Sequence, residues 1–168
     1  MLIGVISDSH DDWQALIAVG RRLHSMGARV VVHAGDWTSP FSMLKLRRAV
    51  GPEARIVTVF GNNDGDRHNF AVKAREAAVE ILGEAGALEV DGLKIGIYHG
   101  TSDILVEAMA RSSLFDVVIY GHTHRPEVRR LNGTLLINPG ELCGCAGEKK
   151  TAALLDTKTL QVELIEVK

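Results

Sequence analysis

The sequence lacks the features that mark membrane, secreted and nucleic-acid-binding proteins. No apolar stretch in its 168 residues approaches the roughly 20 residues needed to cross a bilayer. The first six residues lead to Asp8 without the basic segment or cleavage site of a signal peptide. Its 19 Lys and Arg residues against 21 Asp and Glu give a formal charge of −2, which leaves no basic surface for a stable nucleic-acid complex. We therefore expect a soluble cytoplasmic protein that does not contact membranes.

Cysteine is also scarce, since the chain has only Cys143 and Cys145, separated by Gly144. A disulfide across a single residue would form a cramped ring, far from the usual geometry of such bonds. We therefore expect reduced thiols in a loop, as is usual in the cytoplasm. A redox role or adventitious metal binding is the alternative.

Short apolar runs alternate with helical patterns in the first half of the chain. The runs are rich in Val and Ile, and each is followed by Gly or Asp, which suits strands buried on both faces; they cover residues 2–7, 28–34, 55–60 and 115–120. Helices are predicted from 3.6-residue spacing, from a Pro in a first turn, or from Ala- and Glu-rich composition; they cover residues 13–26, 39–50, 70–82 and 103–112.

The second half of the chain is dominated by hairpins. Asp91-Gly92 and Asn132-Gly133 each separate two apolar runs and are strong two-residue hairpin turns. Residues 156–159 separate a third pair of predicted strands. No linker or repeat is visible, so residues 1–168 are expected to form one domain, which buries about two thirds of the surface of the unfolded chain. The expected fold is α/β, with two mixed β-sheets packed face to face and helices outside them.

Short segments at the ends of predicted strands carry side chains that bind metals. They supply two carboxylates, one amide and four imidazoles, namely Asp8, Asp36, Asn62, His10, His99, His122 and His124. Oxygen and nitrogen donors without a thiolate suit two divalent first-row metals better than a structural zinc ion. In an open α/β sheet, the loops after the strands form the binding site. The sequence therefore predicts a metal site at one edge of the sheets.

The spacing within these segments supports a shared site. Asp8 and His10, like His122 and His124, are one residue apart, so in an extended segment both side chains point the same way. A glycine lets the chain turn before Asp36, whose carboxylate can bridge two cations. Taken singly, each segment could equally be a turn, a strand exit or a helix cap rather than part of a metal site. The metal interpretation depends on all of them occurring together.

The ordered set Asp-x-His, Gly-Asp, Gly-Asn-x-Asp, His-Gly and Gly-His-x-His resembles the calcineurin-like metallophosphoesterase superfamily. The short chain and the Asn-Pro-Gly at residues 138–140 resemble its small phosphodiesterase branch from bacteria and archaea. The resemblance covers residues 2–140. It implies a four-layer α/β/β/α sandwich with a two-metal centre.

The resemblance also implies a role for each donor. One ion would bind Asp8, His10 and His124, the other would bind Asn62, His99 and His122, and Asp36 would bridge them, with Asp36, Asn62 and His99 as the catalytic residues. The expected cofactor is a pair of divalent ions, manganese first, with nickel, iron, zinc and cobalt as alternatives. The expected reaction is hydrolysis of a small phosphodiester, a nucleotide among the candidates, by a metal-bridging hydroxide.

Two positions depart from the superfamily pattern. Many members carry a histidine at the position of Asn63, where it protonates the leaving oxygen, and an Asn side chain cannot do so. Glu141 stands where a serine is common in relatives. Among the remaining polar residues, we expect His33 to be a satisfied core histidine and His68 an exposed loop residue. Asp64 is expected to orient Asn62 or to cap the next helix.

The alternative function belongs to a different class. A retromer subunit resembles this fold and serves as a protein scaffold with an impaired metal site. Here all the predicted donors are competent, which favours the enzyme. A nuclease or a protein phosphatase would need a basic groove or large insertions, and neither is visible. The sequence leaves the physiological substrate, the native metal and homo-oligomerisation open.

Overall fold

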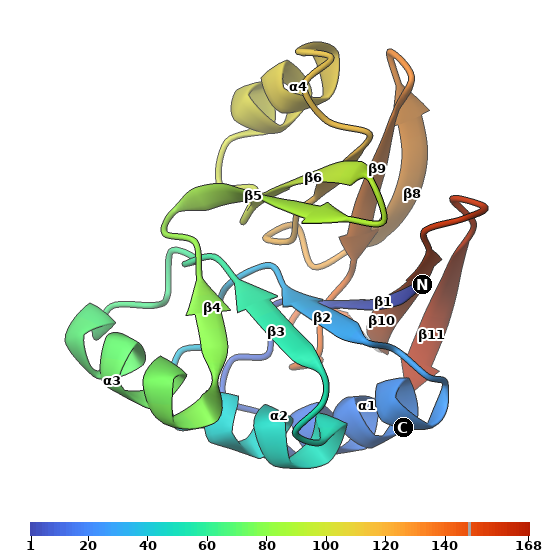
Figure 1. Ribbon diagram of the computed structural model, residues 1–168. Helices are drawn as coiled ribbons and strands as arrows, with labels where there is room; N and C mark the ends of the chain where they lie inside the picture. Colours follow the sequence, from blue (N-terminus) through green and yellow to red (C-terminus); the bar gives the residue numbers. More distant parts are fainter. Residues whose placement is uncertain (148) are drawn as a thin grey trace.

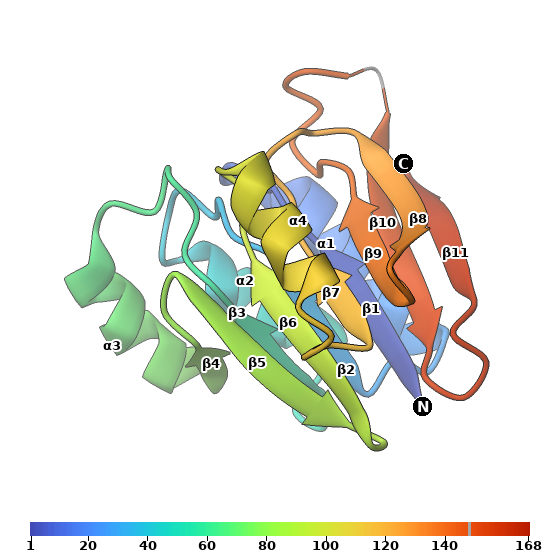
Figure 2. The same cartoon turned by 90° about the horizontal axis from the view of Figure 1, so that it is seen from above.

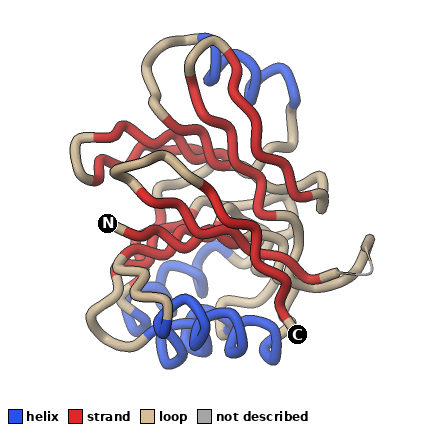
Figure 3. Tube along the Cα trace, turned by 90° about the vertical axis from the view of Figure 1, so that its right-hand side faces the viewer, coloured by secondary structure: helices blue, strands red, loops and turns tan. Residues whose placement is uncertain are grey.

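The protein folds as a stack of four layers. The computed structural model describes residues 1–147 and 149–168. Figure 1 shows two β-sheets packed in the middle, with α1, α2 and α3 below the first sheet and α4 above the second. Figure 3 shows the same order from the side, with the helices outside the strands. The predicted α/β/β/α sandwich of two mixed sheets is confirmed. Among the described residues, no helix has both the length and the apolar character of a membrane span.

The first sheet has six strands in the order β11-β10-β1-β2-β3-β4. These strands are β1 (Leu2–Ile6), β2 (Val30–His33), β3 (Arg55–Thr58), β4 (Val79–Ile81), β10 (Lys150–Asp156) and β11 (Val162–Val167). β1 to β4 run parallel, whereas β10 and β11 add as antiparallel strands. The parallel strands are connected through α1 (Trp13–Ser25), α2 (Ser42–Val50) and α3 (Arg67–Ala77). This is the βαβ pattern predicted for the first half.

The second sheet has five strands in the order β5-β6-β7-β9-β8. Its strands are β5 (Ala85–Val90), β6 (Leu93–Tyr98), β7 (Val117–Ile119), β8 (Pro126–Leu131) and β9 (Thr134–Pro139). Helix α4 (Asp103–Arg111) connects β6 to β7. The turns Asp91-Gly92 and Asn132-Gly133 have positive φ at both residues, which matches the predicted two-residue hairpins. β6, β7 and β9 run parallel to one another.

Three apolar cores hold the layers together. The central core lies between the sheets and is built from short branched side chains such as Val5, Val32 and Ile97. A second core, which includes Phe70, lies between the first sheet and helices α1 to α3. A smaller one lies under α4. Because both faces of the inner strands are covered, these strands carry near-continuous apolar sequences.

The predicted helix over residues 70–82 is wrong at both ends. The helix begins earlier, at Arg67, because the Asp66 side chain accepts a hydrogen bond from a backbone N–H of its first turn. It ends at Ala77, since Ala78 takes a left-handed conformation with φ of 50°. Val79 then pairs with Ile56 as part of the parallel edge strand β4. Tertiary pairing therefore overrides an Ala- and Glu-rich sequence.

The two sheets present the carboxyl ends of several strands at one edge of the molecule. β1, β2 and β3 are parallel neighbours in the first sheet, and β6 and β7 are parallel neighbours in the second. Figure 2 shows that β1 and β6 run in roughly the same direction, from lower right to upper left. The loops that follow these five strands therefore meet.

Candidate metal centre

The structure brings together all the donors that the sequence predicts. They lie after β1 (Asp8, His10), β2 (Asp36), β3 (Asn62), β6 (His99) and β7 (His122, His124). Asp8, Asp36 and His99 are buried, with at most 1% of each residue exposed. Because the strands run parallel within each sheet, residues far apart in the sequence share this one edge.

Asp36 lies at the middle of the cluster. Its Oδ2 is 3.3 Å from His99 Nε2 and 3.6 Å from His10 Nε2. On one side, Asp8 Oδ1 lies 3.3 Å from His124 Nε2 and 3.9 Å from His10 Nε2. Asp36 therefore contacts both groups of donors, as a bridging carboxylate would.

His99, Asn62 and His122 form the other side of the cluster. Asn62 Oδ1 lies 3.1 Å from His99 Nε2. The His122 ring packs edge-on against the His99 ring, with 5.2 Å between their centroids. The His122 backbone N–H donates to Asp8 Oδ2 at 3.0 Å, which connects the two sides. Asn62, His99 and His122 therefore lie side by side, and their assignment to one ion stays a prediction.

The donor set fits divalent cations. Among the described residues, the buried Asp8 Oδ1 and His10 Nε2 have no hydrogen-bond partner. In the same part of the chain, the ion pairs of Asp8 and Asp36 involve histidines and no Lys or Arg. A carboxylate buried without a Lys or Arg partner is costly unless hydrogen bonds or a bound cation offset its charge. A divalent cation bound to these atoms would offset that cost.

The titration behaviour of the buried groups follows from the same contacts. Burial raises the pKa of Asp8. Burial also acts to raise the pKa of Asp36, but hydrogen bonds from His99 and Asn63 outweigh it and hold the pKa well below its usual range. For His99, burial acts to lower the pKa, and the nearby Asp36 carboxylate raises it overall. The titrations of Asp36 and His99 are therefore coupled, and a cation bound at these atoms would compete with a proton on the imidazole.

Two histidines have their metal-facing nitrogen fixed by a partner on the other side of the ring. His99 Nδ1 donates to the Ala34 carbonyl at 2.8 Å, and His124 Nδ1 donates to Glu141 Oε2 at 2.6 Å. Because Nδ1 carries the hydrogen in this tautomer, Nε2 presents its lone pair to the cluster. Both rings are therefore oriented as ligands.

Five donors have backbone conformations that are uncommon for residues other than glycine. Their φ angles are 52° at Asp8, 39° at His10, 60° at Asp36, 67° at His122 and 59° at His124. Such conformations persist where the surrounding structure imposes them, and they concentrate at functional sites.

Asp64 and Asn63 hold the loops around Asp36. Asp64 accepts backbone N–H bonds from Gly61, Asp36 and Thr38 at 2.8, 3.0 and 2.9 Å. Asp66 and not Asp64 caps α3, so the predicted cap is wrong. Asp64 fastens the loop after β2 to the loop after β3, and its predicted role in orienting Asn62 stays a prediction. Asn63 donates through its backbone N–H and its side chain to the two oxygens of Asp36, at 2.8 and 2.7 Å.

Glu141 is a part of the site that the sequence did not reveal. It is 1% exposed, and its carboxylate accepts hydrogen bonds from His124 and from the backbone N–H groups of Cys145, Ala146 and Gly147. Burial acts to raise its pKa, but these bonds outweigh burial and lower it. The only sequence signal was its place after Asn-Pro-Gly.

The two cysteines are joined as a disulfide, so the prediction of reduced thiols is wrong. The loop winds around the Glu141 carboxylate, and Gly144 takes a left-handed conformation with φ of 66°. The Cα atoms of Cys143 and Cys145 come within 5.2 Å of each other, which lies in the range that disulfides span. The carboxylate that shapes this turn is not visible from residue spacing.

His33 is placed as predicted, and His68 is exposed as predicted but lies on helix α3 rather than in a loop. His33 is buried, with Nε2 2.9 Å from Ser9 Oγ and Nδ1 accepting from the Gly35 N–H at 3.1 Å. Its ring stacks on Trp37 at 3.7 Å, so it is a satisfied core histidine.

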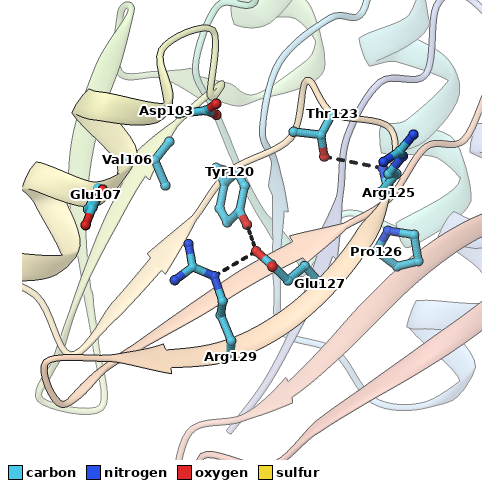
Figure 4. Close-up of a pocket in the computed structure, with 9 residues that line it drawn as sticks. All are labelled: Asp103, Val106, Glu107, Tyr120, Thr123, Arg125, Pro126, Glu127 and Arg129. Carbon is cyan, nitrogen blue, oxygen red and sulfur yellow. Dashed lines mark hydrogen bonds and ion pairs between the residues drawn. The ribbon is translucent and has the colours of Figure 1, made fainter.

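A cavity of about 480 Å³ lies next to the loop that carries His122 and His124. Figure 4 shows Tyr120 and Arg129 converging on the Glu127 carboxylate within it, and Thr123 facing Arg125. Arg129 Nε donates to Glu127 at 3.0 Å, and Tyr120 donates its hydroxyl to the same oxygen. Burial and this carboxylate raise the pKa of Tyr120.

Two further hollows adjoin the donors themselves. One of about 520 Å³ is lined by His124, Arg125 and Lys149 together with residues of the cysteine loop. One of about 200 Å³ is lined by Asn62 and His99 on the other side of the cluster. The cluster therefore adjoins one hollow beside His124 and a smaller one beside Asn62 and His99.

Comparisons with known proteins agree with this geometry. The model of the calcineurin-like phosphoesterase superfamily domain matches residues 1–160. A phosphodiesterase of Methanocaldococcus jannaschii is 34% identical over 94% of this chain and 94% of its own length. A probable metallophosphoesterase of Methanothermobacter thermautotrophicus is 30% identical over 83% of this chain and 76% of its own.

Solved structures show the same relationship. The structure of an archaeal phosphodiesterase superposes with a TM-score of 0.92 at 32% identity and covers 99% of this chain and all of its own. Zinc-bound Vps29 of Entamoeba histolytica superposes with a TM-score of 0.63 at 20% identity, with 99% of each chain covered. The second similarity is one of fold alone.

Proposed function

The chain belongs to the calcineurin-like phosphoesterase superfamily, and on this premise we propose that it is a phosphodiesterase that uses two divalent ions. The observation that carries the proposal is the position of Asp36, whose Oδ2 faces His99 at 3.3 Å and His10 at 3.6 Å. One ion would be held by Asp8, His10 and His124, and the other by Asn62, His99 and His122, with Asp36 between them. The nitrogen and oxygen donors suit manganese, with nickel, iron, zinc and cobalt as alternatives.

The residues around the centre would have separate roles in catalysis. Divalent ions at this position would supply an activated water and offset charge on the phosphate oxygens. Asp36 stays ionised because its pKa is held low, and Asn63 fixes both of its oxygens. Asn62 and His99, 3.1 Å apart, line the adjoining hollow, where phosphate oxygens would bind, and both residues would hold one of the ions. Asn63 has no titrating proton to give to the leaving oxygen.

The surroundings favour a small anionic substrate. Arg125 and Lys149 line the hollow of about 520 Å³ beside His124, and Arg67 lines the hollow of about 200 Å³ beside Asn62. These cationic side chains would attract a phosphodiester from either side. The hollows suit a small diester, a nucleotide among the candidates, better than a polymer.

A metal-reconstitution experiment tests the proposal. Metal-depleted protein is loaded with manganese, iron, nickel, zinc or cobalt and assayed against a panel of phosphodiesters and monoesters. We expect about two ions per chain and turnover of diesters. His99→Ala should abolish turnover, whereas His68→Ala, which removes an exposed histidine, should leave it intact. Absence of turnover with every ion in the wild-type chain would contradict the proposal.

A scaffold function is the second candidate, because Vps29 shares the fold. A scaffold protein would keep the four-layer fold but would not need all the side chains that bind the two ions. The same experiment separates the two, since a scaffold would bind ions without turnover of any ester in the panel.

A further inference from the structure

Cys143 lies against the donor cluster. Its sulfur and one ring nitrogen each of His10 and His124 lie within 4.8 Å of one another. Nitrogen and sulfur ligands of one zinc ion lie roughly 3.5 Å apart at tetrahedral angles, so a small movement of the side chain would complete this set. The Cys143 backbone N–H donates to the Asp8 carbonyl at 3.1 Å, which fastens the residue to a loop that carries predicted ligands.

A second set, formed by Glu141, Cys143 and Cys145, also lies within 4.8 Å but makes a poorer site. The Glu141 oxygens already accept hydrogen bonds from His124 and from three backbone N–H groups. Cys145 is exposed. By contrast, the His10 Nε2 atom is buried and has no hydrogen-bond partner among residues 1–147 and 149–168. The set with His10 and His124 therefore includes a histidine that has an unpartnered ring nitrogen, which the set with Glu141 and Cys145 lacks.

We propose that Cys143 is a redox-dependent ligand of the ion that Asp8, His10 and His124 hold. The proposal rests on the metal centre proposed above. In the structure the sulfur is bonded to Cys145 and is not available as a thiolate. A dithiol reductant supplies two electrons and two protons, so the S–S bond breaks, each cysteine gains an S–H, and the reductant becomes a disulfide. The Cys143 thiol then releases its proton to solvent as the sulfur binds the ion.

The redox state of this loop would select the metal. With the disulfide closed, the donors are oxygen and nitrogen atoms, which suit manganese. With the disulfide open, a thiolate joins them, and thiolates favour zinc, iron or cobalt over manganese. The Glu141 carboxylate couples the two states to the site, since its Oε2 lies 2.6 Å from His124 Nδ1 and 3.0 Å from Cys143 Sγ.

Cobalt(II) tests the proposal directly, because a thiolate ligand produces a charge-transfer band in the near-ultraviolet spectrum. The full chain, loaded with cobalt, should show this band after reduction and lack it when oxidised. Cys145→Ser cannot form the disulfide and should show the band with or without reductant. Cys143→Ser is the matched control and should lack it under both conditions. Zinc affinity of reduced Cys143→Ser should be at least about tenfold below that of Cys145→Ser, with manganese affinity nearly equal.

Each outcome has a distinct meaning. Stoichiometric cobalt without the band, in both the reduced wild-type chain and Cys145→Ser, would overturn this inference and leave the proposed function standing. A band that persists in Cys143→Ser would also overturn it, because the sulfur would come from Cys145. Failure of the wild-type chain to bind cobalt, zinc or manganese at all would remove the metal centre and both proposals with it.

Discussion

Adding one methyl group at Gly61 should disable the site without replacing any of the donor residues. Gly61 passes directly against Asp36, and a Cβ on it would overlap the Asp36 Oδ1 and backbone N and lie 2.8 Å from Cγ. Neither atom can move freely. The Asp36 N–H donates to Asp64 at 3.0 Å, and Asp36 Oδ1 accepts from the Asn63 N–H at 2.8 Å. Gly61→Ala must therefore displace the bridging carboxylate or break these bonds.

The size of the effect follows from these contacts. Overpacking a tight interior costs about 1–3 kcal/mol, and a hydrogen bond to a charged group contributes about 1.5–3 kcal/mol. We expect the free energy of unfolding of the metal-free protein to fall by about 2–4 kcal/mol. A displacement of about 1 Å in a catalytic group costs about 10²-fold in rate. The kcat/KM for a diester should therefore fall by about two orders of magnitude or more, and metal content should fall with it.

Gly65 provides the matched control in the same loop. A Cβ there would meet nothing within 4 Å, and the residue is not among the glycines with positive φ. Gly65→Ala should therefore bind metal, unfold in urea and hydrolyse an activated aryl diester as the wild-type protein does. Elemental analysis, urea unfolding and steady-state kinetics are measured on both variants. If Gly61→Ala matches Gly65→Ala in metal content and kcat/KM, the carboxylate of Asp36 is not the bridge.

Three other perturbations test separate parts of the site. Asp36→Asn should lower the metal content at both ion positions and remove nearly all turnover. His10→Ala should weaken the binding of mainly one ion. An active Asp36→Asn protein with two ions per chain would contradict the assignment. Asn63→His should raise kcat/KM selectively for poor leaving groups, by up to about 10²–10⁴-fold, and equal slopes against leaving-group pKa would show that another group supplies the proton. Burial holds the pKa of His33 well below its usual 6.5. Below about pH 6.5 the unfolded chain therefore binds a proton at this histidine that the folded protein does not bind. The free energy of unfolding of the metal-free protein should fall as the pH drops through this range. His33→Gln should flatten that decline in urea unfolding, and an unchanged slope would exclude His33 as its source.

The sequence indicated that the donors share one edge because that much follows from the direction of the strands. Once β1, β2 and β3 are recognised as parallel buried strands, their carboxyl ends must share an edge. Asp8, Asp36 and Asn62 then converge whatever the details of the loops. The hairpin turns were equally visible, since Asp91-Gly92 and Asn132-Gly133 favour the positive φ angles that the turns require.

The features that the sequence did not predict depend on contacts between distant residues. β4 is a strand because Val79 pairs with Ile56, and local composition favoured helix instead. The Asp64 carboxylate joins two loops through backbone N–H groups that any residue carries. Glu141 acts on His124 from seventeen positions away and shapes the cysteine loop around itself. None of these contacts leaves a periodic pattern in the chain.

The site concentrates the local features that oppose folding. Donors such as Asp8 and Asp36 combine left-handed backbone conformations with buried carboxylates that have no Lys or Arg partner among the described residues. Left-handed conformations cost of order 1 kcal/mol or more each, and buried unpaired charges cost more. The three apolar cores support this arrangement because they fix both sheets independently of the loops. A left-handed conformation alone does not mark a functional residue, since Ala78 and Asp91 adopt it at a helix end and in a hairpin turn. Its combination with a buried carboxylate at Asp8 and Asp36 is the conflict that a functional site explains.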